Sequence, residues 1–89
     1  MKLRYLEVTF RNGKAMAAYL YLPRQEGDVS VRTIRREGDL LVDYSADGRP
    51  IGIEITSPAN VNLDTLNRVL ASLAQEPATA EEFSPVGVG

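Results

Sequence analysis

Residues 5–10 alternate between polar and apolar positions. Apolar side chains take every second position from Leu6 to Phe10, which is the period of a half-buried β-strand. Asn12-Gly13 follows, and this pair is the strongest short signal for a hairpin because a type I′ turn needs positive φ at both central residues. We therefore predict a strand over residues 3–10, a tight turn, and a returning strand over residues 15–22.

The returning strand is apolar on both of its faces. A helix is the alternative, because alanine, methionine and leucine favour helices, but the preceding turn and the Tyr-Leu-Tyr run favour a strand. A strand of this kind is expected at a central or doubly covered position. One face would carry Met16, Ala18, Leu20 and Leu22, and the other would carry Ala15, Ala17, Tyr19 and Tyr21.

Three further strands are predicted, over residues 29–36, 40–45 and 50–56. Turns at Glu37-Gly38-Asp39 and Asp47-Gly48 separate them, because glycine and aspartate accept the positive φ angles that turns require. In the last strand the isoleucines alternate with glycine and glutamate. They are therefore expected to face the core, with the intervening glutamate on the other face of the sheet.

The period changes from two to about 3.6 after residue 58. Leucines from Leu63 to Leu73 recur at spacings of three, four and three, which places them on one face of an amphipathic helix. Asn62 or Asn60 is the expected N-cap, and Pro77 is expected to end the helix. A sheet must bury its apolar face against another element, and this leucine stripe is the candidate cover.

These elements predict an α+β fold. It would contain an antiparallel β-meander of about five strands, with one C-terminal amphipathic helix packed on one face; meander order is the default for short connections. Residues 1–75 are expected to form a single domain. Residues 76–89 are rich in proline, glycine, alanine and glutamate, and we expect a flexible acidic tail in which Phe83 and Val86 make only weak contacts.

The composition argues against several kinds of chemistry. The 89 residues include no cysteine and no histidine, and the net charge is −2. Catalytic sites of the Ser-His-Asp and Cys-His types and zinc sites built on cysteine or histidine are therefore excluded. We expect no enzymatic activity, no cofactor and no metal.

The same sequence indicates a cytoplasmic location. A chain without cysteine fits a reducing compartment, and no apolar run approaches the ~20 residues that span a bilayer. Arg4 and Glu7 interrupt the N-terminal segment, so we expect neither a signal peptide nor membrane association.

One segment resembles a known family. The pattern Val-Asp-Tyr, Gly and Gly-Ile-Glu-Ile is similar to that of the small prokaryotic domain-of-unknown-function family 2283. It falls on Val42, Asp43, Tyr44, Gly48, Gly52, Ile53, Glu54 and Ile55.

The resemblance extends over most of residues 5–75 and implies a compact antiparallel sheet with a helix. The first hairpin departs from the family pattern, since its acidic residues are missing and only the Ala-x-Tyr-Leu half remains. The resemblance implies no activity, but it suggests a partner protein encoded by a neighbouring gene.

Two carboxylates give an alternative hypothesis. Asp43 and Glu54 lie on neighbouring predicted strands and are both expected on the face away from the core. Two carboxylates on one face can share a proton or bind a hard cation such as Mg²⁺. A metal-binding or enzymatic domain using this pair is therefore the first alternative, although charged side chains are most often solvated.

A cluster of arginines gives a second alternative. Arg32, Arg35 and Arg36 lie close together in the sequence, and basic patches bind phosphates in nucleic acids. The sequence pI of about 5.0 and the adjacent Glu37 and Asp39 favour an ordinary surface of mixed charge. Nucleic-acid binding is the less favoured reading.

The favoured function is a small non-enzymatic protein-interaction module. If one helix covers one face of the sheet, Tyr19 and Tyr21 are exposed on the other, and an exposed apolar patch usually marks a partner surface. Asp43 and Glu54 lie on the same face and complete the candidate interaction residues. The partner would be a second copy, giving a homodimer or larger homo-oligomer, or a protein encoded nearby.

Overall fold

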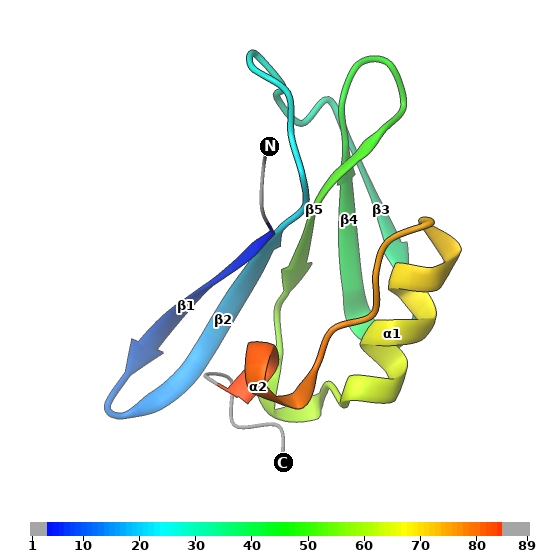
Figure 1. Cartoon of the computed structure of the whole chain (residues 1–89). Coiled ribbons are helices and arrows are strands. Elements are labelled where there is room, and N and C mark those ends of the chain that lie inside the picture. The colour runs from blue at the N-terminus through cyan, green and yellow to red at the C-terminus, as the bar shows by residue number, and fades with distance from the viewer. Residues whose placement is uncertain (1–3, 85–89) are drawn as a thin grey trace.

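One antiparallel sheet of five strands carries helices on one face (Figure 1), in a computed structural model that describes residues 4–84. This confirms the α+β class. The strands are β1 (Tyr5–Arg11), β2 (Lys14–Tyr21), β3 (Arg32–Arg36), β4 (Leu40–Tyr44) and β5 (Pro50–Ile55). The helices are α1 (Leu63–Ser72) and α2 (Ala80–Phe83), with short 3₁₀ turns at Glu37–Asp39 and Pro58–Asn60. Within the described residues, no helix is long and apolar enough to cross a membrane.

The strand order is β1-β2-β5-β4-β3, so the expected meander order is wrong. After β2 the chain runs through residues 22–31 to the far edge of the sheet and then returns strand by strand to β5. The isoleucines of β5 are fully buried, and the centre of the sheet is where such a strand is best covered. β3 takes the edge, where its arginine side chains reach solvent.

β3 is also shorter than expected. It begins at Arg32, and the preceding Val29 and Val31 are exposed. Only one backbone bond continues the ladder there, from the Val31 N–H to the Tyr44 carbonyl at 2.9 Å. The residues before it belong to the connection that crosses the end of the sheet, so their alternating pattern does not make a strand.

The β1–β2 hairpin projects beyond the rest of the sheet (Figure 1), because only residues 18–21 of β2 pair with β5. Asn12 and Gly13 have φ angles of 53° and 77°, as the predicted tight turn requires. A bulge follows, in which Phe10 pairs with Ala15 while Thr9 pairs with Ala17. Ala15 therefore shares a face with Phe10 rather than with Tyr19, so the strict alternation expected along β2 is wrong near the turn.

Helix α1 begins as predicted at the Asn62 cap, whose side-chain oxygen accepts a hydrogen bond from the Thr65 N–H at 2.8 Å. It ends at Ser72, before Pro77. Ala74 adopts a φ of 59°, and the Gln75 N–H bonds to the Leu70 carbonyl at 2.9 Å. This is the geometry of a Schellman cap, so a left-handed residue and not the proline ends the helix.

The core lies between the sheet and the helices. It is built mainly from β5, β4, β2 and α1, and its fully buried side chains include Leu20, Leu40, Val42, Ile53, Ile55, Leu66 and Leu70. Phe83 of α2 is 1% exposed and belongs to the same cluster. The segment after residue 75 therefore packs on the core up to Ser84, where a flexible tail was expected.

Polar contacts hold this last segment in place. The Arg4 guanidinium donates to the Glu82 carboxylate at 3.0 Å and to the carbonyls of Glu76 and Pro77. The Asn67 side chain bonds both the N–H and the carbonyl of Ala78. These contacts argue against a domain boundary at residue 75; Val86 lies outside the described residues.

Candidate interaction site

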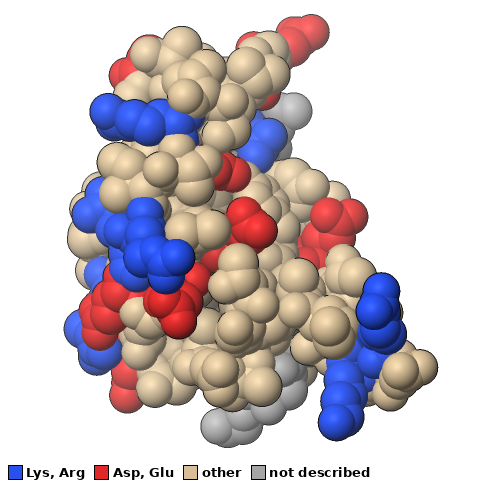
Figure 2. Space-filling view, turned by 180° about the vertical axis from the view of Figure 1, so that it is seen from behind, with Lys and Arg blue, Asp and Glu red and all other residues tan. Residues whose placement is uncertain are grey.

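The candidate residues lie on the face of the sheet away from the helices (Figure 2). Cross-strand pairing places Tyr19 between Glu7 of β1 and Glu54 of β5. Tyr21 follows two residues later on the same face. In Figure 2, acidic groups stand among uncharged atoms near the middle of this face, and most basic groups lie toward its left and lower right margins. We call it the open face.

The expected alternation along β5 is confirmed. Ile51, Ile53 and Ile55 are fully buried, while Glu54 is half-buried on the open face. The four residues named from the sequence, Tyr19, Tyr21, Asp43 and Glu54, therefore share one face of the sheet. Their role in binding stays a prediction.

Tyr19 and Asp43 form the centre of the open face. The Tyr19 hydroxyl donates to Asp43 Oδ2 at 2.7 Å, and Thr33 Oγ1 donates to Asp43 Oδ1 at 2.5 Å. Arg24 Nη2 donates to the Tyr19 hydroxyl oxygen at 3.2 Å. Burial of the ring, and then the bond to the Asp43 carboxylate, raise the pKa of Tyr19 above its ordinary value. The hydroxyl is thus neutral at physiological pH and acts as a donor.

The Tyr19 ring lies directly over Gly52. A Cβ built on Gly52 would stand 2.0 Å from the Tyr19 hydroxyl oxygen and 2.3 Å from Cζ, distances that real atoms do not reach. The lack of a side chain at Gly52 is therefore what allows Tyr19 to lie across the central strand and reach Asp43 on β4.

Three tyrosines form one aromatic cluster. The Tyr5 and Tyr21 rings are stacked with centroids 4.7 Å apart, and Tyr19 meets Tyr21 edge-on at the same distance. The Arg24 guanidinium lies 5.1 Å from the Tyr21 centroid, within the range of a cation–π contact. Tyr5 is 56% exposed, so the cluster offers an apolar surface to solvent.

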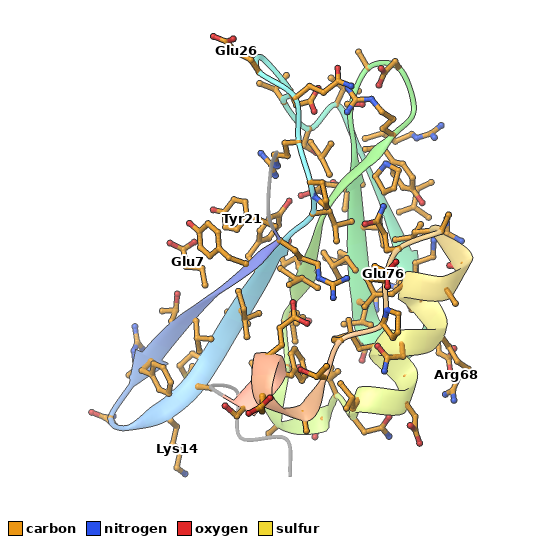
Figure 3. All side chains as sticks on the ribbon, in the orientation of Figure 1. Glu7, Lys14, Tyr21, Glu26, Arg68 and Glu76 are labelled. Carbon is orange, nitrogen blue, oxygen red and sulfur yellow. The ribbon has the colours of Figure 1, made fainter. Side chains whose placement is uncertain are left out.

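Glu7 extends the cluster at the β1 edge. The Tyr21 hydroxyl donates to Glu7 Oε1 at 3.2 Å, and this bond raises the pKa of Tyr21. Figure 3 shows both side chains directed away from the helices. Sequence reasoning missed Glu7 and Arg24 as parts of this site, because their positions depend on strand register and on the path of a loop.

A shallow hollow lies between the two glutamates. Its volume is about 150 Å³, and it is lined by Glu7, Thr9, Ala17, Ala18, Tyr19 and Glu54. Within residues 4–84, neither Glu7 nor Glu54 forms an ion pair. The hollow therefore combines an aromatic wall with two carboxylates that no described cation neutralises.

A comparison with protein-family models gives one match. Residues 15–57, from β2 to the end of β5, match the family described as a protein of unknown function (DUF2283). This segment belongs to the DUF2283 family. No curated protein and no solved structure matches the chain.

The DUF2283 match covers a shorter stretch than the resemblance expected from the sequence. It includes Tyr19, Asp43, Gly52 and Glu54 but ends before α1 and does not reach β1. The centre of the open face thus lies within the DUF2283 segment, while Tyr5 and Glu7 come from outside it.

The two carboxylates of the metal-binding alternative, Asp43 and Glu54, lie on neighbouring strands but not directly opposite each other. Asp43 is already bonded by Tyr19 and Thr33, and in the register of β4 and β5 it lies opposite Gly52 rather than Glu54. The part of the chain that the structure describes holds no group of three or more acidic side chains placed to bind a metal ion. Nothing in the DUF2283 segment therefore favours the metal-binding alternative.

The three arginines of β3 do not converge. Arg32 and Arg36 pair with Tyr44 and Leu40 on the helix side of the sheet, and the intervening Arg35 lies on the open face. Arg36 donates to the Tyr44 hydroxyl, and Arg35 bonds Asp39 at 2.7 Å. A single basic patch built from these residues is therefore absent.

A polar network at the loop end of the sheet was not predicted. Arg49 makes two hydrogen bonds to the Asp28 carboxylate, at 2.7 and 3.0 Å, and a third to Asp47 at 2.9 Å. The Ser45 hydroxyl and then Arg49 lower the pKa of Asp47 to about 2, and the Arg49 hydrogen bonds lower that of Asp28. Arg49 bridges the two carboxylates, which lie on different loops, so we assign the network to holding two loops of the DUF2283 segment together.

Proposed function

We propose that the protein is a small non-enzymatic interaction module, and that its open face binds a protein segment carrying lysine or arginine. The observation that supports this most directly is the hollow beside Tyr19, where Glu7 and Glu54 stand without a cationic partner among the described residues. A basic side chain would pair with these carboxylates.

The surroundings of the hollow suit such a ligand. The aliphatic stem of a lysine or arginine can pack on an aromatic ring while its charged end reaches a carboxylate, and the exposed Tyr5 ring lies beside Tyr21. The Tyr19–Asp43 bond fixes one wall of the hollow. Little ordering is then needed on binding, which lowers its entropic cost.

A non-enzymatic role fits the side chains present. The chain has no histidine and no cysteine, the side chains most often used for proton transfer and nucleophilic attack at neutral pH. The proposal includes a cytoplasmic location, because a chain without cysteine fits a reducing compartment.

The test uses two synthetic peptides of equal length and apolar content. One carries lysine and arginine at the positions where the other carries glutamate and aspartate. We expect only the basic peptide to bind, with an affinity that falls as salt is added, measured by fluorescence anisotropy and by amide chemical shifts. The shifted amides should lie in β1, β2 and β5 around the hollow.

A matched pair of variants separates this site from a general attraction to an acidic protein. Glu54→Gln should weaken binding of the basic peptide about fivefold. Glu26→Gln makes the same change in net charge on a loop far from the hollow (Figure 3) and should leave binding unchanged. Equal losses in the two variants, or no binding by either peptide, would overturn the proposal.

A further inference from the structure

Among residues 4–84, β1 is an edge strand of the sheet, with no other strand on its outer side (Figure 1). It is seven residues long, from Tyr5 to Arg11, and contains neither proline nor glycine. On such a strand every second residue turns its backbone N–H and carbonyl away from the sheet, which makes the edge a template for another strand. The backbone edge of β1 is distinct from the open face, but the two surfaces share Glu7 and Thr9, which also line the hollow.

The opposite edge is not equivalent. β3 has five residues, of which three are arginines, and like charges on facing strands oppose pairing. β1 has one acidic and one basic residue, Glu7 and Arg11. A second copy of the chain can therefore pair at the β1 edge without meeting a row of like charges.

The projecting end of the hairpin has apolar surface to cover. Phe10 is 55% exposed and Met16 is 49% exposed, and neither belongs to the core cluster. Before Ala18, on the side of the turn, β2 pairs only with β1, and two strands alone are marginally stable in water. A further strand beside β1 would support this part of the sheet.

The charges of β1 select one register. Glu7, Thr9 and Arg11 are spaced by two residues and share one face. In an antiparallel pair of β1 strands with a two-fold axis at Thr9, each Glu7 lies opposite Arg11 of the other copy. On the second face each Val8 lies opposite Phe10. The neighbouring register, with its axis at Val8, would place Glu7 opposite Thr9 and leave both charges without an opposite charge across the strands.

We infer that two copies associate through β1 in this register, joining their sheets into one antiparallel sheet of ten strands. Two features carry the inference. The first is the symmetric match of Glu7 with Arg11, neither of which has an ion pair within residues 4–84. The second is the exposed Phe10, which would gain a partner from the second copy.

The first test is solution mass by light scattering over a dilution series. We expect a species of twice the 9.8 kDa chain mass that dissociates on dilution. Arg11→Glu places one glutamate of the other copy opposite each Glu7 and should raise the dissociation constant about tenfold or more. Glu7→Arg combined with Arg11→Glu exchanges the charges and should restore the dimer.

Arg35→Glu provides the matched control, since it makes the same charge change on the β3 edge and should leave the dimer intact. Circular dichroism of each variant checks that the monomer is folded. A wild-type chain that is monomeric throughout would overturn the inference. So would a dimer that Arg11→Glu does not weaken, or a double variant that does not recover.

A second measurement reports the register directly. The chain has no cysteine, so Thr9→Cys introduces a single thiol at the proposed axis. Opposed Cα atoms in an antiparallel pair are about 4.5–5.5 Å apart, within the range that a disulfide spans. Mild oxidation should therefore convert Thr9→Cys to a covalent dimer much faster than Thr33→Cys on the other edge. Equal rates would contradict the β1 register.

Discussion

At the residue scale, the position of Tyr19 depends on the missing side chain at Gly52. The ring lies over the glycine and its hydroxyl reaches Asp43 at 2.7 Å. In Gly52→Ala the added Cβ would overlap the ring, so Tyr19 must swing away and lose this bond. We expect the free energy of unfolding to fall by about 1–3 kcal/mol, measured by urea denaturation.

The control is a double-mutant cycle with Tyr19→Ala, which removes the ring. In that background the added methyl meets no aromatic ring, and Gly52→Ala should cost much less than in the wild type. The difference between the two costs isolates the contact between residues 19 and 52. Equal costs in both backgrounds would show that Gly52 is needed for another reason.

The sequence predicted which residues share the open face but not which of them touch. Period-two alternation is enough to place Tyr19, Tyr21 and Glu54 on one face, since side chains two apart in a strand point the same way. The bond from Tyr19 to Asp43 also requires the register of β2, β5 and β4, which is set by tertiary pairing. Arg24 lies in a loop, where no periodic pattern indicates its direction.

At the element scale, α1 ends with a residue that is unfavourable for its conformation. Ala74 has a φ of 59° at the position of a Schellman cap that usually holds glycine. An L-residue pays roughly 1–2 kcal/mol for the left-handed conformation. We therefore expect Ala74→Gly to raise the free energy of unfolding by about 1 kcal/mol, observed as a higher midpoint in urea.

Ala71→Gly is the matched comparison for this prediction. Ala71 is also exposed but lies inside α1, where glycine is about 1 kcal/mol less favourable than alanine. The same substitution three residues apart should thus have opposite effects. A loss of stability in both variants would show that the cap does not have the left-handed geometry.

Most elements could be predicted, because each carries its own local signal. The Asn12-Gly13 turn, the alternation in β5 and the leucine spacing in α1 are properties of short segments. The strand order is not local. It depends on β5, with its fully buried isoleucines, taking the centre of the sheet, and on the connection over residues 22–31 being long enough to carry the chain to the far edge. The predicted meander order was therefore wrong, because the strand order depends on burial across the whole sheet and not on signals in short segments.

At the scale of the whole molecule, the two ends of the described chain meet. Arg4, just before β1, bonds Glu82 of α2 and the carbonyls of Glu76 and Pro77. Composition alone suggested a flexible tail, because α2 has four residues, too few to show a helical period. Only the packing of Phe83 into the core reveals that this segment is part of the same folded unit.

This packing gives the last prediction. Phe83 is 1% exposed, so Phe83→Ala should leave a cavity and lower the free energy of unfolding by about 3–5 kcal/mol. Glu81→Ala, at an exposed position of the same helix, should change it by less than about 0.5 kcal/mol. Urea unfolding followed by far-UV circular dichroism gives both values. If Phe83→Ala unfolds at the wild-type midpoint, α2 does not contribute to the core, and residues 1–75 hold the sheet and α1 together without it.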